Sequence, residues 1–206
     1  MLNDPLWDFD IWIKKNTGIF TGVFVLYVSA LCAGVFFVRG FVASDANLFA
    51  GFYENLTINV NDGDIGFWLL FIETLKINIR YLFFMFIAGF IVVGVPFVLA
   101  IFSMKIFCLG FALGTIYSLS YDGGFILSVL TIFLQNMFSL PLLTFYAVIC
   151  TKFSFRLYKN VRGIPEIKND FAKALRTHIT VFVIFALLIT AASFFECLSV
   201  LAFSSG

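Results

Sequence analysis

A lysine stands inside a long apolar run. Lys105 is the one charged residue of GVPFVLAIFSMKIFCLGFALG, which runs from Gly94 to Gly114. Charged side chains at membrane depth are costly and usually face the interior of a helix bundle. A later apolar run carries Gln135 and Asn136, whose amide oxygens can accept a hydrogen bond from an ammonium group. The chemistry that these residues indicate is hydrogen bonding between helices within a membrane.

Three roles are open for Lys105. The depths expected for Lys105, Gln135 and Asn136, roughly 12 to 15 Å from the membrane surfaces, are compatible with one polar cluster that packs two helices together. Alternatively, the lysine extends along its own stem to the cytoplasmic headgroups. A solute or ion path is disfavoured, because no acidic partner at similar depth is evident. Glu196 lies only a turn or two from the outer end of its apolar run.

The sequence indicates no catalysis. The single histidine, His178, lies at the edge of the last apolar run and has no set of Ser, Cys or Asp around it that resembles a catalytic triad. We interpret it as an interfacial residue. The four cysteines fall in apolar runs without paired spacing, and no glycine-rich phosphate loop occurs. We therefore expect no enzyme activity, no metal, no cofactor and no nucleic-acid partner.

Composition predicts an all-α, polytopic membrane protein. Of the 206 residues, 62% are hydrophobic and 12% are charged, whereas soluble domains carry about 25% charged residues. Several apolar stretches exceed the roughly 18 to 20 residues that cross a bilayer. We expect a single domain with five transmembrane helices, at approximately residues 18–41, 77–94, 97–120, 125–151 and 178–201. A short interfacial helix around Trp68 to Lys76 precedes the second span.

The division between the second and third spans rests on residue chemistry. Residues 79–119 are apolar almost without pause, about twice the length of one crossing, so a turn lies within them. A break at Ser103 to Lys105 would leave a third span of about 14 residues, or about 21 Å, too short for a core of about 30 Å. A break at Gly94 to Pro96 leaves two adequate spans, because Gly favours a helix end and Pro a helix start. We expect this break, with Lys105 inside the third helix.

The charged loops predict the orientation. Segment 152–177 is rich in Lys and Arg, and Lys14 and Lys15 precede the first span. Because Lys and Arg concentrate in cytoplasmic loops, we expect the amino end inside and the carboxyl end outside. Segment 152–177 is then a basic cytoplasmic loop that contacts anionic membrane lipids, and the polar segment 43–64 is external.

The external segment contains the stretch ANLFAGFYENL. Its large apolar residues recur at helical spacing, at Leu48, Phe49, Phe52, Tyr53 and Leu56. A stripe of this kind can bind a partner protein, or it can lie on the membrane surface. The sequence leaves both interpretations open.

Two pairs of glycines, each pair four residues apart, lie in apolar runs. They are Gly110 with Gly114, and Gly18 with Gly22. Small residues at this spacing allow two helices to approach closely. Packing within one chain is favoured over a contact between two copies of the chain, so a homo-oligomer stays a secondary possibility.

The order of these features resembles the stage II sporulation protein M family. The resemblance lies in INIRYLFFMFIAGFIVVGVPFVLAIFSMKIFCLGFALG and DGGFILSVLTIFLQNMFSLPLLTFYAVICTKFSFRL. The features that match the family are the chain length, the five spans, the Gly-x-Pro break, the lysine in an apolar run and the Gln-Asn pair. One position departs, because family members often place Pro before the Gln-Asn pair, where this chain has Leu134.

The resemblance implies a scaffold and not an enzyme. Members of the family stand in the mother-cell membrane of endospore-forming bacteria, at the sporulation septum. They recruit stage II sporulation proteins D and P, which cut peptidoglycan outside the membrane and drive septal thinning and engulfment. The alternative that the sequence leaves is a small permease, or the membrane subunit of a transporter, that uses Lys105.

Overall fold

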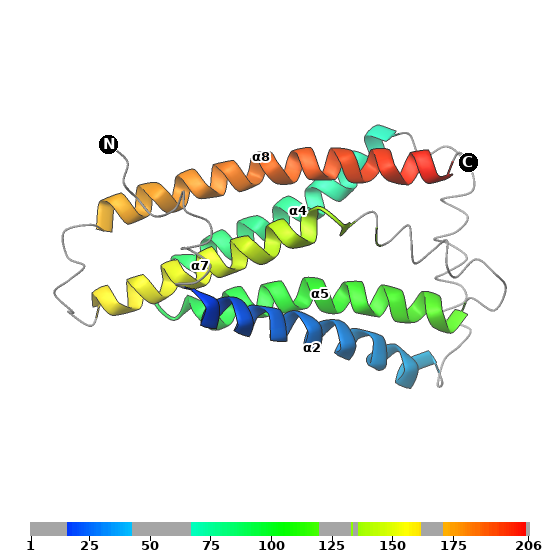
Figure 1. Cartoon of the computed structure of the whole chain (residues 1–206), viewed down its shortest axis with the longest axis horizontal. Coiled ribbons are helices and arrows are strands. Elements are labelled where there is room, and N and C mark those ends of the chain that lie inside the picture. The colour runs from blue at the N-terminus through cyan, green and yellow to red at the C-terminus, as the bar shows by residue number, and fades with distance from the viewer. Residues whose placement is uncertain (1–15, 43–66, 120–132, 134–135, 162–170, 205–206) are drawn as a thin grey trace.

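The computed structural model describes five helices. It covers residues 16–42, 67–119, 133, 136–161 and 171–204, and no strand occurs among them. The helices alternate in direction along one bundle axis (Figure 1). Their bounds are α2 Thr17–Val42, α4 Phe67–Gly89, α5 Gly94–Leu119, α7 Ser139–Val161 and α8 Phe171–Ser204.

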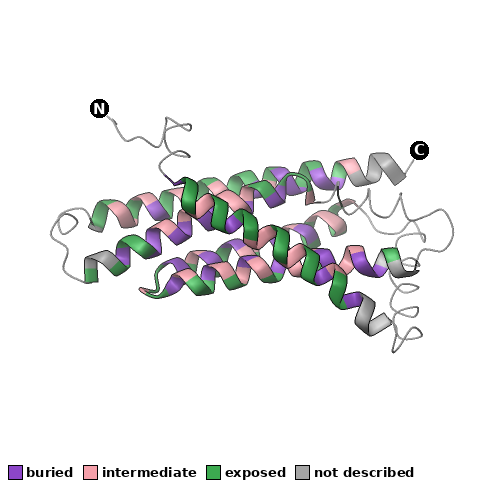
Figure 2. Cartoon of the chain, turned by 60° about the horizontal axis from the view of Figure 1, so that its bottom comes forward, coloured by how far each residue is buried: buried purple, intermediate pink, exposed green. Residues whose placement is uncertain are grey.

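Four of these helices are long and apolar enough to cross a membrane. The candidate spans are Thr17–Val38, Gly94–Thr115, Ser139–Tyr158 and Ala172–Ser199. Exposed residues recur along these helices (Figure 2). They include large apolar ones such as Phe36 and Leu187, which are 65% and 67% exposed. Lipid is the solvent that such a surface requires, because water would oppose its exposure. The all-helical class and the membrane class predicted from the sequence are therefore confirmed.

A tight turn joins α4 to α5. Helix α4 ends at Gly89 and α5 begins at Gly94, so the predicted break near Gly94 is confirmed and Lys105 lies inside α5. A side chain at Gly94 would overlap the carbonyl of Ala88, which explains the glycine. Ser154 of α7 holds the turn, because its hydroxyl accepts from the Gly94 N–H at 3.1 Å and donates to the Ile91 carbonyl at 2.9 Å.

Two predicted elements differ from the structure. The expected interfacial helix and second span form one continuous helix, α4, since helical spacing of apolar residues continues through its charged positions. The fourth span was expected over 125–151, and most of its first half lies outside the described residues; Phe133 and Asn136 are helical, a turn follows at Met137 and Phe138, and α7 then runs from Ser139 to Val161. The start of α7 therefore lies well inside the bundle, short of the end that α5 and α8 reach (Figure 1).

Glycines set the contact between α2 and α5. An added methyl group at Gly34 of α2 would overlap the backbone of Phe107, and one at Gly110 of α5 would overlap the backbone of Leu31. At Gly114 it would lie 3.0 Å from the Val35 carbonyl oxygen. The two backbones are thus in direct contact, which is how small residues associate helices where lipid removes the hydrophobic driving force.

The Gly18 and Gly22 pair of α2 does not share in this contact. A methyl group at either position meets no atom within 4 Å. Both glycines are exposed on the outer face of α2. The two pairs look alike in sequence, and only their positions around α2 and α5 distinguish them.

We predict that Gly110→Ala lowers the free energy of unfolding by about 1 to 3 kcal/mol, because the added methyl group forces α2 and α5 apart. Unfolding in mixed micelles of detergent and dodecyl sulfate measures this quantity. Gly22→Ala is the matched control, since it adds the same methyl group in open space. Equal stability of the two variants would show that the α2–α5 contact does not need glycine.

Candidate functional site: a buried polar cluster

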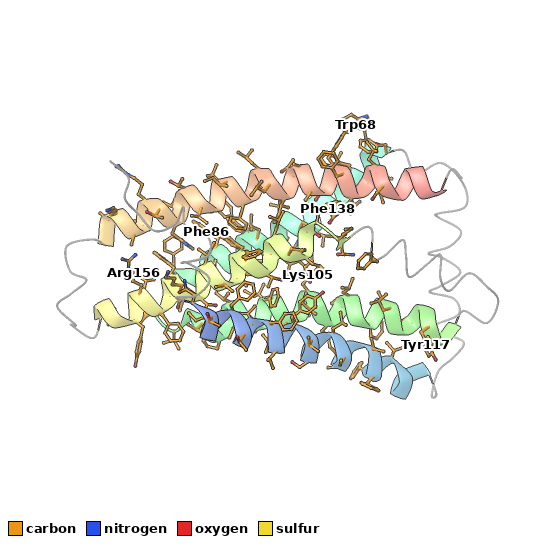
Figure 3. All side chains as sticks on the ribbon, in the orientation of Figure 1. Trp68, Phe86, Lys105, Tyr117, Phe138 and Arg156 are labelled. Atoms are coloured by element: carbon orange, nitrogen blue, oxygen red, sulfur yellow. The ribbon has the colours of Figure 1, made fainter. Side chains whose placement is uncertain are left out.

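Lys105 is buried at the centre of the bundle. Its side chain is 8% exposed and lies among α4, α5 and α7 (Figure 3). The ammonium group donates a hydrogen bond to Oδ1 of Asn78 on α4. It also lies 5.3 Å from the centroid of the Tyr81 ring, a distance at which the ring face attracts a cation.

Asn78 joins three helices through its two amide atoms. Its oxygen accepts from Lys105 of α5, and its Nδ2 donates to Oγ of Ser193 on α8 at 3.1 Å. Because each end of the amide has a different partner, the orientation of the Asn78 side chain is defined. A second contact lies one turn away along the same pair of helices, where Sγ of Cys197 approaches Oγ1 of Thr74 at 3.9 Å.

Glu196 of α8 caps the first turn of α7. One carboxylate oxygen, Oε1, accepts from the backbone N–H groups of Ser139 and Phe138, at 2.7 Å and 3.2 Å. The first N–H groups of a helix have no partner within it, and the helix dipole favours a negative charge there. A helix that begins inside a membrane protein cannot use bulk water for this purpose. Glu196 supplies both the acceptor and the charge.

The cluster contains one basic side chain and one acidic side chain. Lys105 and Glu196 attract each other electrostatically, although these two side chains do not form a direct ion pair. Glu196 is fully buried, and its second oxygen, Oε2, makes no hydrogen bond to any residue that the structure describes. We call Asn78, Lys105, Ser139, Ser193 and Glu196 the polar cluster; it links α4, α5, α7 and α8.

The predicted partners of Lys105 are only partly described. Gln135 lies outside the described residues. Asn136 lies ahead of α7 and is partly exposed, whereas Lys105 bonds to Asn78. The burial of Lys105 excludes the interpretation that it extends to the headgroups. Glu196 of α8 lies close enough to attract Lys105, and it stands three residues before the end of the candidate span Ala172–Ser199, near the outer end as expected.

The cap that Glu196 provides was not predicted, because the start of α7 falls inside an apolar run. Helix α8 continues to Ser204, and α7 begins beside Glu196 rather than beyond it. One pattern in the sequence could have predicted the polar cluster. Thr74 and Asn78 are four residues apart, as a polar pair on one face of α4, and Ser193 and Glu196 are three apart on one face of α8.

The other predicted site residues have different outcomes. The external stripe of Leu48, Phe49, Phe52, Tyr53 and Leu56 lies outside the described residues. Gly110 and Gly114 lie at the contact with α2. Four cysteines are free, and among the described residues no group of three His, Cys, Asp or Glu side chains is placed to hold a metal ion.

His178 is buried rather than interfacial. It is 2% exposed, and its ring stacks on Phe153 with 4.0 Å between centroids and 1° between planes. Phe86 stacks on it at 5.2 Å, and Phe90 meets it edge-on at 5.3 Å. Gly89 provides the space, since a methyl group there would lie 3.2 Å from Nε2 of the histidine. The histidine thus fastens α8 to α4 and α7 at the end of the bundle opposite Trp68.

These observations define a class of protein: a polytopic helical membrane protein whose helices are joined by buried polar groups. The chain belongs to the stage II sporulation protein M family, because the model of that family, described as stage II sporulation protein M, matches residues 23–198. The protein is therefore a member of a sporulation-related family of membrane proteins. No curated protein matches the chain significantly. No solved structure does so either.

We predict that Glu196→Ala lowers the free energy of unfolding by about 3 to 5 kcal/mol, because it leaves the first N–H groups of α7 unpaired and the charge of Lys105 uncompensated. Glu196→Gln should cost less, since it keeps an acceptor oxygen. The measurement is again unfolding in mixed micelles.

The control for this prediction is Thr190→Ala on the same helix. Among the described residues, the Thr190 hydroxyl bonds to the carbonyl of Ala186 within its own helix, at 2.8 Å, so its loss should cost less than about 1 kcal/mol. Combining Lys105→Met with Glu196→Gln should cost less than the sum of the two single changes, because the residues interact. Additive losses would contradict the electrostatic coupling.

Proposed function

We propose that the protein is a non-catalytic membrane scaffold. It recruits and positions the peptidoglycan hydrolases known as stage II sporulation proteins D and P outside the membrane, for septal wall thinning and forespore engulfment. The observation that carries the proposal is the family match over residues 23–198. In this proposal the protein stands in the mother-cell membrane at the sporulation septum.

The proposal includes five crossings with the amino end inside. Helix α4 is the fifth crossing, because it runs antiparallel to α5 and packs within the bundle. Its Asn78 bonds to Lys105 and Ser193, which lie inside the candidate spans of α5 and α8. Basic residues support the orientation. Those on the described helices at the inner end are Lys152, Arg156, Lys159, Lys173 and Arg176.

In this orientation the external segment 43–64 faces the space where the hydrolases act. The start of α4 and the ends of α2, α5 and α8 lie at that same end of the bundle (Figure 1). The stripe of Leu48, Phe49, Phe52, Tyr53 and Leu56 is the proposed contact for the hydrolases. A rigid bundle beneath it suits a scaffold, because a fixed platform lowers the entropy lost when a partner binds.

The bonding of the polar cluster also favours a scaffold over a permease. Asn78 bonds to Lys105 and Ser193, and Glu196 caps α7. Each of these bonds joins different elements of the fold, so the buried charges act in packing. A buried lysine and glutamate are nevertheless groups that transporters use. We therefore keep a small permease as the second candidate function.

We predict that tagged protein, isolated in mild detergent from cells early in sporulation, retains the two hydrolases. The triple change of Phe49, Phe52 and Tyr53 to Ser should lose them, because it removes the aromatic contact area. A matched control changes Asn47, Asn55 and Asn59 to Ser in the same segment, and it should retain them. Failure to recover either hydrolase with the native protein after mild crosslinking would refute the scaffold and shift attention to transport through Lys105.

The topology has its own test. Alkaline phosphatase is active only outside the cytoplasm, so we expect activity when it is fused after Ser204 and none when it is fused after Val161. A fusion within 43–64 should be active. The reverse pattern would invert the orientation, and activity at both Val161 and Ser204 would exclude α8 as a crossing.

A further inference from the structure

The outward face of α4 carries charged residues among apolar ones. Glu73 and Lys76 form an ion pair at 3.1 Å, with side chains 58% and 61% exposed. Arg80 is also exposed, and it makes no hydrogen bond or ion pair with any residue that the structure describes. Together with the exposed Ile77 and Phe84, these residues form one stripe, which we call the α4 stripe.

The stripe follows from helical geometry. Residues 73, 76, 77, 80 and 84 recur at three- and four-residue intervals, so they share one side of the helix. The buried residues of α4 lie on the other side, at Thr74, Asn78, Leu82, Met85, Ala88 and Gly89. The charges therefore point away from the bundle and from the polar cluster.

In the proposed five-crossing topology, Arg80 lies near the middle of the membrane. At 1.5 Å per residue its Cα is about 18 Å along the helix from Trp68 and about 14 Å from Gly89. Trp68, near the outer end of α4 (Figure 3), is of the type that marks a membrane surface, and the turn after Gly89 marks the inner end. Arg80 also follows Asn78 by two residues, and Asn78 bonds to Lys105 midway along the α5 span.

An exposed arginine at this depth is costly in lipid. Insertion measurements place the cost of a central arginine at about 2.5 to 3.5 kcal/mol, and residues of this kind almost always face protein or water. Water is a poor explanation here, because Ile77 and Phe84 flank Arg80 on the same exposed face and are each 49% exposed. A protein segment that covers the stripe removes both the cost of an arginine in lipid and the cost of apolar side chains in water.

The charges decide what kind of segment fits. Glu73 and Lys76 neutralise each other, and no other residue that the structure describes compensates the positive charge of Arg80. A second copy of this chain does not fit, because a two-fold axis through the stripe would place each residue against its own equivalent and bring two arginines together. The complementary group is a carboxylate, which accepts a bidentate hydrogen bond from a guanidinium.

We propose that the α4 stripe is the docking surface for the transmembrane helix of another protein, one that carries an Asp or Glu near its middle, opposite Arg80. The proposal rests on the five-crossing topology of the proposed function, which puts α4 inside the membrane. It does not depend on which protein is recruited. A scaffold with this surface holds a partner within the membrane as well as through the external segment 43–64.

The test uses the full-length protein, fused to a fluorescent donor, in phosphatidylcholine vesicles. The probe is a leucine host helix labelled with an acceptor and carrying Asp, Leu or Lys at its midpoint. We expect the Asp helix to bind about tenfold more tightly than the Leu helix, and the Lys helix to bind no better than the Leu helix. Arg80→Leu should abolish the preference for Asp, and Arg80→Lys should keep most of it.

Arg156→Leu is the matched control. Arg156 is an exposed arginine on α7 at the inner end of the bundle, and its change should leave the preference intact. The proposal is wrong if the Asp and Leu helices bind equally, or if the two arginine variants behave alike. It is also wrong if donor-labelled and acceptor-labelled copies of the protein associate with each other through Arg80. Vesicles contain no hydrolase, so failure of the hydrolase isolation would leave this result unchanged.

Discussion

A helix that begins inside a helix bundle must have its first N–H groups satisfied by protein, and this constraint organises the structure. Helix α7 starts at Ser139, and Glu196 of α8 accepts hydrogen bonds there. This contact fixes how α8 is rotated, so that Ser193, one turn earlier, faces Asn78 of α4. Asn78 in turn receives Lys105 of α5, whose charge balances that of the glutamate. The positions of four helices are thereby coupled to one carboxylate.

The remaining contacts use different physical means at different places. Helices α2 and α5 are in backbone contact at Gly34 and Gly110. The Ser154 hydroxyl of α7 bonds to the α4–α5 turn. Stacked rings around His178 pack α8 against α4 and α7. In lipid, apolar surface alone gives little reason for helices to associate. Helices in lipid associate instead through close packing of small residues and through hydrogen bonds between helices. This explains why many of the residues at these contacts are Gly, Ser and Asn.

Two sets of charged residues have opposite surroundings. Lys105 and Glu196 are enclosed by four helices and balance each other, so they serve the integrity of the bundle. Arg80 faces outward without a partner among the described residues, so the bundle by itself does not account for it. A scaffold needs a stable interior and a surface to which a partner protein binds. The polar cluster provides the first of these, and the α4 stripe together with the external segment is our proposal for the second.

The sequence by itself determined the membrane class, most of the helices and the break before α5, because these depend on local composition and on the backbone preferences of Gly94 and Pro96. It also held the family resemblance. The tertiary structure decided the partner of Lys105, the role of Glu196, the burial of His178 and which glycine pair touches another helix. Hydrophobic spacing specifies a helix but not which of its faces meets a neighbour. The start of α7 was hidden for a related reason, since the apolar run continues through it and the signal for its cap lies 57 residues away on α8.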